Sequence, residues 1–180
     1  MDFFRLRKVL TAWYGAQNPA IRADHAERLA AKVQAWAKTA GAADYDLDLL
    51  TTLAHLLPVR TQVLATAANR GTLEAFLVEQ GWPPLRCREL FHSLERLPDK
   101  PKLPEELLVA DADTLQQFGV LGFARQLAIC TERGLSLADC AEAILRSLSR
   151  KIHTPVGQLE AQKPRQVLRE LVAELKRALG

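Results

Sequence analysis

The chain has 180 residues, of which 48% are hydrophobic and 25% are charged. This composition is typical of a folded globular domain, and a chain of this length buries about 70% of its unfolded surface. The formal net charge is only +3, and the basic residues are dispersed among acidic ones. This pattern argues against a nucleic-acid groove. No apolar run approaches the roughly 18–20 residues that a membrane span needs.

The cysteines and the N-terminal residues indicate where the protein resides. Cys87, Cys130 and Cys140 form no close doublet, so we expect three small buried side chains in a reducing compartment and not a disulfide or zinc framework. The first eight residues, Met-Asp-Phe-Phe-Arg-Leu-Arg-Lys, lack the apolar core of a signal peptide. We therefore expect a cytoplasmic protein that is not attached to a membrane.

The sequence predicts helices throughout, because no segment alternates apolar and polar residues in the manner of a strand. The first helix is expected over residues 3–14, followed by Gly15 and a Gln-Asn-Pro turn at 17–19. A long second helix is expected over about 21–39. Gly41 stands where a C-cap glycine would end it.

Two histidines lie on the early helices. His25 extends the apolar stripe of the second helix by one turn, so its side chain should point inward. A third helix, expected over 46–57, carries His55 near its end and stops at Pro58. The stripe that places His25 consists of Leu29, Val33, Trp36 and Ala40.

The rest of the chain follows the same pattern. Three prolines between residues 98 and 104 predict a loop, and Gly134 separates two of the later helices. We expect one all-α domain over 1–180, with a core at about 20–150 on which the helices at 3–14 and 164–179 pack. The remaining predicted helices cover residues 61–68, 72–80, 82–97, 105–110, 112–133, 137–149 and 164–179.

The most distinctive segment begins at Val109 and reads Val-Ala-Asp-Ala-Asp-Thr-Leu-Gln-Gln-Phe-Gly-Val-Leu-Gly-Phe-Ala-Arg. Asp111 and Asp113 are predicted to open the helix that follows, because the unpaired amide groups and the dipole of a helix start favour carboxylates. We expect one of the two acids to be a helix cap. The other is a candidate ligand.

This segment resembles the fourth motif of the HD-superfamily metal-dependent phosphohydrolases, in which the acid before x-Leu, here Asp113, is a metal ligand. The family also has a histidine on an early helix and a later His-Asp doublet. His25 and His55, thirty residues apart, match these positions in spacing and context. The resemblance covers about residues 20–150. It implies an all-α, HD-domain-like orthogonal helical bundle in which these three side chains converge to hold a divalent metal such as Zn, Fe, Mn, Ni or Co.

The resemblance is broken at the doublet. Leu56 stands where the family has its aspartate, and a leucine cannot bind a metal. The two nitrogens and one oxygen that remain suit a site with open positions, but the lost carboxylate should weaken binding of ions that prefer oxygen. The resemblance includes a further histidine pattern with two positions about five residues apart on the preceding helix. His92 matches the first position, but Leu97 stands at the second. Arg60, Asp111 and His92 are the remaining candidates for a catalytic role.

Three functions follow from this comparison. The leading hypothesis is an HD-fold protein with a reduced site, weakly active or inactive, which binds a nucleotide, a phosphorylated small molecule, a protein partner or a second copy, with or without metal. The first alternative is an active hydrolase in which a metal held by His25, His55 and Asp113 activates water. The second is a helical interaction module without a pocket. The apolar strip of such a module would lie on the N-terminal helix and consist of Phe3, Phe4, Leu6, Val9, Leu10 and Trp13. Packing of this helix on the bundle, or in a dimer contact, is the simpler role for these residues.

Overall fold

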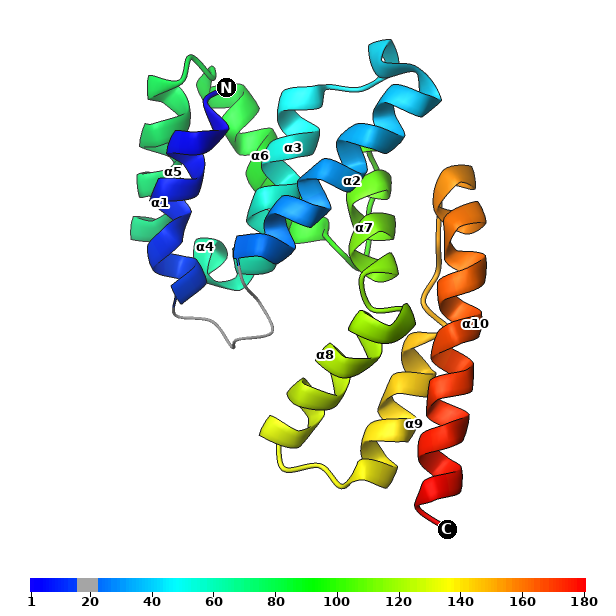
Figure 1. The fold of residues 1–180 in the computed structure, drawn as a ribbon. Helices are drawn as coiled ribbons and strands as arrows, with labels where there is room; N and C mark the ends of the chain where they lie inside the picture. The colour runs from blue at the N-terminus through cyan, green and yellow to red at the C-terminus, as the bar shows by residue number, and fades with distance from the viewer. Residues whose placement is uncertain (16–22) are drawn as a thin grey trace. The chain divides into compact units, whose positions relative to one another are not determined.

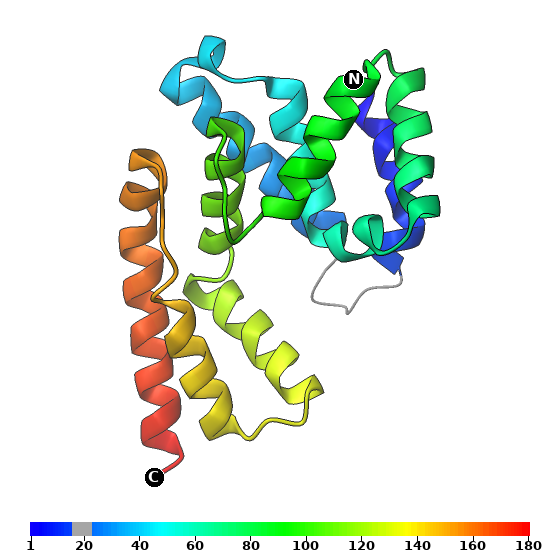
Figure 2. The same ribbon diagram turned by 180° about the vertical axis from the view of Figure 1, so that it is seen from behind.

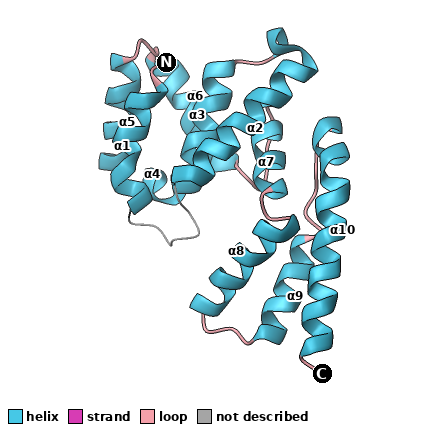
Figure 3. Ribbon diagram, in the orientation of Figure 1, coloured by secondary structure: helices cyan, strands magenta, loops and turns pink. Residues whose placement is uncertain are grey.

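The computed structural model describes residues 1–15 and 23–180, and these residues form helices and turns with no strand among them (Figures 1 and 3). The all-α fold class is therefore confirmed. The described chain divides into two compact units, unit 1 over Met1–Ala110 and unit 2 over Asp111–Gly180. The single domain expected over 1–180 stays a prediction. No helix among residues 1–15 and 23–180 is both long enough and apolar enough to cross a membrane.

Unit 1 is built around α3, which packs against α1, α2 and α6. Every residue from Leu49 to Leu56 is buried, including His55. Leu53 and Leu56 are completely enclosed, and burying a leucine contributes about 1.5–3 kcal/mol. The helices of unit 1 are α1 (Phe3–Gly15), α2 (Ala23–Gly41), α3 (Leu47–Leu56), α4 (Arg60–Ala65), α5 (Ala67–Glu79), α6 (Pro84–Arg96) and the first part of α7 (Pro104–Leu115).

Helix α1 packs into unit 1 along its apolar stripe. Leu6 and Leu10 are fully buried and Tyr14 is nearly so. Of the six apolar residues that would form an exposed strip, only Phe4 is largely exposed. Helix α1 therefore buries most of its apolar residues against the other helices of unit 1 and does not present them as an exposed strip.

Several predicted boundaries of unit 1 are set by local caps. Gly41 ends α2 as predicted, with the positive φ of 105° that a glycine adopts at little cost. The helix predicted over 72–80 begins earlier, at Ala67, because the Thr66 hydroxyl caps it and accepts a bond from the Asn69 amide at 3.1 Å. The predicted turn at 17–19 and the predicted helix start at residue 21 lie outside the described residues.

Unit 2 is a small helical assembly in which α8 (Gly119–Glu132) and α9 (Leu137–Ser147) pack against α10 (Pro155–Ala178), as Figure 2 shows from behind. Gly134 makes the predicted turn between α8 and α9, with φ of 73°. The core of this unit consists of Phe118, Ala141, Ile144, Ile152, Ala161, Leu168 and Val172.

The predicted helix start at Asp111 and Asp113 is wrong. Helix α7 continues through both acids, and α8 begins only at Gly119. The two glycines of the motif explain this break. Gly119 adopts a positive φ of 69°, and a methyl group on Gly122 would lie 2.2 Å from the backbone carbon of Gln117. The tight turn between α7 and α8 therefore depends on these glycines, whereas the acids lie in the last turns of α7.

The predicted start of the last helix at residue 164 is also wrong. Helix α10 begins at Pro155, a first-turn position at which the missing amide hydrogen of proline costs little. Thr154 is its N-cap, and the Thr154 hydroxyl accepts a bond from the Gly157 amide at 3.1 Å. Pro164 lies inside the helix, where proline usually costs about 3 kcal/mol. Packing of Ala161 and the later apolar residues in the core of unit 2 offsets this cost.

The three cysteines are free thiols and are buried, as the sequence predicts. Burial raises the pKa of the Cys87 thiol and of the Cys140 thiol above their ordinary values. A buried thiol that stays protonated packs as a small apolar side chain.

Candidate functional site

Two of the three predicted metal ligands lie in unit 1. His25 is on α2 and His55 is on α3, two helices that pack together, and both side chains are buried. Asp113 is half-buried on α7 and belongs to unit 2. Within each unit, the described residues form no group of three or more His, Cys, Asp or Glu side chains that could hold a metal. The predicted triad draws on both units and stays a prediction.

His55 has the properties of a neutral ligand. Burial lowers the pKa of its imidazole to about 4, and the charge of Arg7 adds to this effect while that of Glu27 opposes it. The ring is therefore uncharged at pH 7, which is the form that binds metals. Its Nδ1 is buried and has no hydrogen-bond partner. A buried polar group without a hydrogen-bond partner costs about 1–3 kcal/mol of stability. A bound ligand that contacts Nδ1 would remove this cost.

Helix α1 forms a wall of the His55 site that the sequence analysis missed. The Phe3 ring stacks on the imidazole, with ring centroids 5.8 Å apart and planes inclined by 28°. The Tyr14 hydroxyl donates a hydrogen bond to the backbone carbonyl of His55 at 2.6 Å. Burial raises the pKa of Tyr14, so its hydroxyl keeps this proton. Both the ring and the backbone of His55 are thus positioned by α1.

An ion pair joins α1 to α2 at the same site. The Arg7 Nη1 donates to the Glu27 Oε1 at 2.7 Å, and the Arg7 Nε donates to the Phe3 carbonyl at 3.3 Å. The two charged side chains are 39% and 51% exposed. Both charges act on the pKa values of His55 and Tyr14. The pair therefore borders Phe3, whose ring stacks on His55, at a place that solvent can reach.

Asp111 is a helix cap, but of a different helix from the one predicted. Its buried carboxylate accepts bonds from the His153 amide at 2.8 Å, the Thr154 amide at 2.6 Å and the Thr154 hydroxyl at 2.7 Å. These groups precede α10, whose first amides and dipole favour a negative charge. The contacts of Asp111 are accounted for by the start of α10.

The other candidates are spread over unit 1. Arg60 begins α4 and is half-buried. His92 lies on the surface of α6 with its side chain 67% exposed, and its Nδ1 is 3.4 Å from a carboxylate oxygen of Glu95. Leu97, which replaces the partner of His92 in the resemblance, is fully buried. An exposed His92 beside a carboxylate behaves as a surface residue and brings no buried donor to the site.

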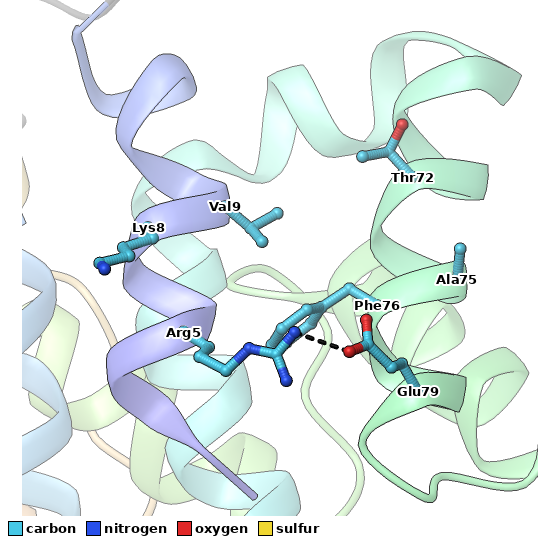
Figure 4. A pocket seen from close by; sticks show the side chains of 7 residues that line it. All are labelled: Arg5, Lys8, Val9, Thr72, Ala75, Phe76 and Glu79. Atoms are coloured by element: carbon cyan, nitrogen blue, oxygen red, sulfur yellow. Dashed lines mark hydrogen bonds and ion pairs between the residues drawn. The ribbon is translucent and has the colours of Figure 1, made fainter.

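A separate hollow of about 420 Å³ lies between α1 and α5 (Figure 4). Arg5 reaches from α1 towards α5 and pairs with Glu79 at 2.6 Å. The sequence predicted none of the hollow's lining residues as site residues. Its lining consists of Arg5, Lys8, Val9, Thr72, Ala75, Phe76 and Glu79.

No protein-family model and no curated protein matches the chain. Solved structures do share its fold. Bacillus subtilis YpgQ in complex with ADP gives a TM-score of 0.72 at 17% identity, covering 96% of this chain and 96% of YpgQ. Another crystal structure of Bacillus subtilis YpgQ gives 0.70 at 16% identity, covering 98% and 96%. A Lactobacillus plantarum protein gives 0.73 at 18% identity, covering 98% and 97%. At these identities the likeness shows a common helical fold.

Proposed function

We propose that this chain is an HD-fold protein with a reduced phosphohydrolase-type site, and that it binds a nucleotide or a phosphorylated small molecule with little or no turnover. The proposal rests on one contrast between neighbouring residues. His55 keeps a buried, neutral imidazole with an unpartnered Nδ1, whereas Leu56 is apolar and fully buried. The fold likeness to YpgQ, which was solved with ADP, supports a nucleotide as the ligand.

The donor set fits a divalent metal in part. His25 and His55 would supply two imidazole nitrogens, and Asp113 would supply one oxygen. A metal bound there would act as a Lewis acid and lower the pKa of its water. The protein's own contribution is to keep the His55 imidazole neutral by burying it, while Phe3 stacks on the ring and Tyr14 holds the backbone carbonyl of His55. With Leu56 in place of a carboxylate, the negative charge available to a divalent ion is smaller, so we expect weak metal binding.

A matched pair of substitutions on α3 tests this arrangement. Leu53 and Leu56 are both completely buried on one helix, so an aspartate at either place should cost about 3–5 kcal/mol of stability. Only Leu56→Asp should then recover thermal stability when Mn²⁺ or Co²⁺ is added, and only this variant should gain hydrolysis of ADP. Leu53→Asp is the control for a buried carboxylate outside the site.

The outcomes separate the hypotheses. If metal restores neither variant, or restores both equally, Leu56 does not face a metal site and the proposal is wrong. If the wild-type protein carries stoichiometric metal and hydrolyses nucleotides at about 1 s⁻¹ or faster, the active mononuclear hydrolase is correct instead. Titration calorimetry with ADP tests the ligand directly, and a wild-type protein that binds neither ADP nor pyrophosphate contradicts the binding half of the proposal.

A further inference from the structure

Three helices bring different chemical groups to the His55 site. Helix α1 contributes the guanidinium of Arg7, α2 contributes the carboxylate of Glu27, and α3 contributes the imidazole of His55. Arg7 donates from Nε to the backbone carbonyl of Phe3 at 3.3 Å, and the Phe3 ring stacks on the His55 imidazole with centroids 5.8 Å apart. The site therefore combines a cation, a carboxylate that neutralises it, and a buried nitrogen that lacks a partner.

We propose that Arg7 binds the anionic group of the ligand, and that Glu27 occupies the guanidinium only until a phosphate or pyrophosphate group displaces it. This inference rests on the proposed function. An arginine presents five N–H donors in a planar fork that matches phosphate oxygens. The bonds to Glu27 and to the Phe3 carbonyl use two of these donors. A phosphate that replaces the Glu27 carboxylate would therefore bind a guanidinium that the Phe3 carbonyl already positions.

The strength of the Arg7–Glu27 pair suits such an exchange. Both side chains are partly exposed, and an ion pair between exposed groups is weak because water and salt screen it. A phosphate group carries more negative charge than a carboxylate and forms charge-assisted bonds with arginine. The ligand is therefore expected to displace Glu27, and the bond from Arg7 Nε to the Phe3 carbonyl keeps the guanidinium on α1.

The same helix provides a matched control. Arg5 lies two residues before Arg7 and pairs with Glu79 at 2.6 Å, a pair of similar length and exposure. Its guanidinium lies about 6.0 Å from the Phe76 ring, at the hollow between α1 and α5 and not at a histidine (Figure 4). Substitutions of Arg5 on α1 and of Glu79 on α5 therefore make the same changes of charge without changing the His55 site.

Titration calorimetry of the full chain with ADP and with inorganic pyrophosphate tests the inference. Arg7→Ala should weaken binding of both probes by about tenfold or more, as expected for the loss of a charge-assisted bond. Glu27→Gln should tighten binding by about two- to fivefold, because the competing carboxylate is gone. Arg5→Ala and Glu79→Gln should stay within about twofold of the wild type.

Each alternative result has a definite meaning. If Arg5→Ala weakens binding as much as Arg7→Ala, the effect is one of net charge and the inference is overturned, although the proposed function stands. A Glu27→Gln variant that binds more weakly also overturns it. Should Arg7→Ala fail to fold, Arg7→Lys decides, since it keeps the charge and loses the fork and is expected to bind more weakly than the wild type. A wild-type protein that binds neither probe overturns the inference together with the proposed function.

Discussion

The buried imidazole of His55 makes the stability of unit 1 depend on pH. The ordinary pKa of histidine is 6.5, and burial lowers the value for His55 in the folded chain to about 4. At about 1.4 kcal/mol for each pKa unit, this difference corresponds to roughly 3 kcal/mol. The unfolded chain binds the proton first, so the contribution of His55 is fully present above pH 6.5. It is lost as the pH falls through the window down to about 4.

Tryptophan fluorescence is a suitable measurement because Trp13, Trp36 and Trp82 all lie in unit 1. Urea unfolding of the wild type and of His55→Gln, each in EDTA and at several pH values from 7 to 4, gives two stability curves. Carboxylates titrate in both proteins, so subtracting the curves isolates the imidazole. The wild type should lose roughly 3 kcal/mol more than His55→Gln over this range.

The control for this experiment is the variant itself, because glutamine is polar and does not titrate. If the difference between the two curves stays constant from pH 7 to pH 4, the imidazole is not held neutral by its surroundings. The description of His55 as a buried neutral ligand would then be wrong, and the proposed metal and nucleotide site would lose its main support.

Two further predictions concern packing and charge. Gly157→Ala should destabilise unit 2 by about 1–3 kcal/mol, because the added methyl group would lie 2.7 Å from the Asp111 Oδ2. Gly71→Ala on α5, whose added methyl would meet nothing within 4 Å, should instead stabilise by about 0.5–1 kcal/mol. Thermal melts of the two variants should shift in opposite directions, and a shift in the same direction would contradict one of the two predictions. Glu106→Gln should cost about 1–3 kcal/mol, because the buried carboxylate accepts bonds from Arg96 and from two backbone amides. Burial raises the pKa of Glu106, but these bonds outweigh burial and hold the pKa below 4.5. The stability difference between Glu106→Gln and the wild type should therefore be complete above pH 4.5 and shrink as the pH falls through the folded-state pKa. A difference in urea unfolding that does not change with pH would refute this role of Glu106.

Local signals in the sequence predicted most of the helices of the fold. The ends of α1, α2 and α3 follow from Gly15, Gly41 and Pro58, whose effects reach only a few residues along the chain. The errors arose where a distant segment decides the local structure. An acid such as Asp111 near a helix C-terminus is locally unfavourable, and it is stabilised here by amides that precede α10. The periodicity of the sequence does not predict such a contact, because the two segments are about forty residues apart along the chain.

The candidate site could be predicted in the same limited way. The apolar pattern places His25 and His55 correctly among the buried residues. A pattern of this kind says which face of a helix is covered, but it does not say which side chain covers it. The stacking of Phe3 and the hydrogen bond of Tyr14 were therefore missed. Convergence of the two histidines with Asp113 stays a prediction.

The three buried cysteines can serve as built-in probes of local unfolding, because they are distributed over both units. Cys87 lies in unit 1, whereas Cys130 and Cys140 lie in unit 2; Cys87 and Cys140 are completely buried and Cys130 is 8% exposed. An alkylating reagent can modify Cys87 or Cys140 only after the surrounding helices separate. Mass spectrometry of peptides from a timed alkylation would therefore report the opening rate of each half of the chain in one sample, without any added label.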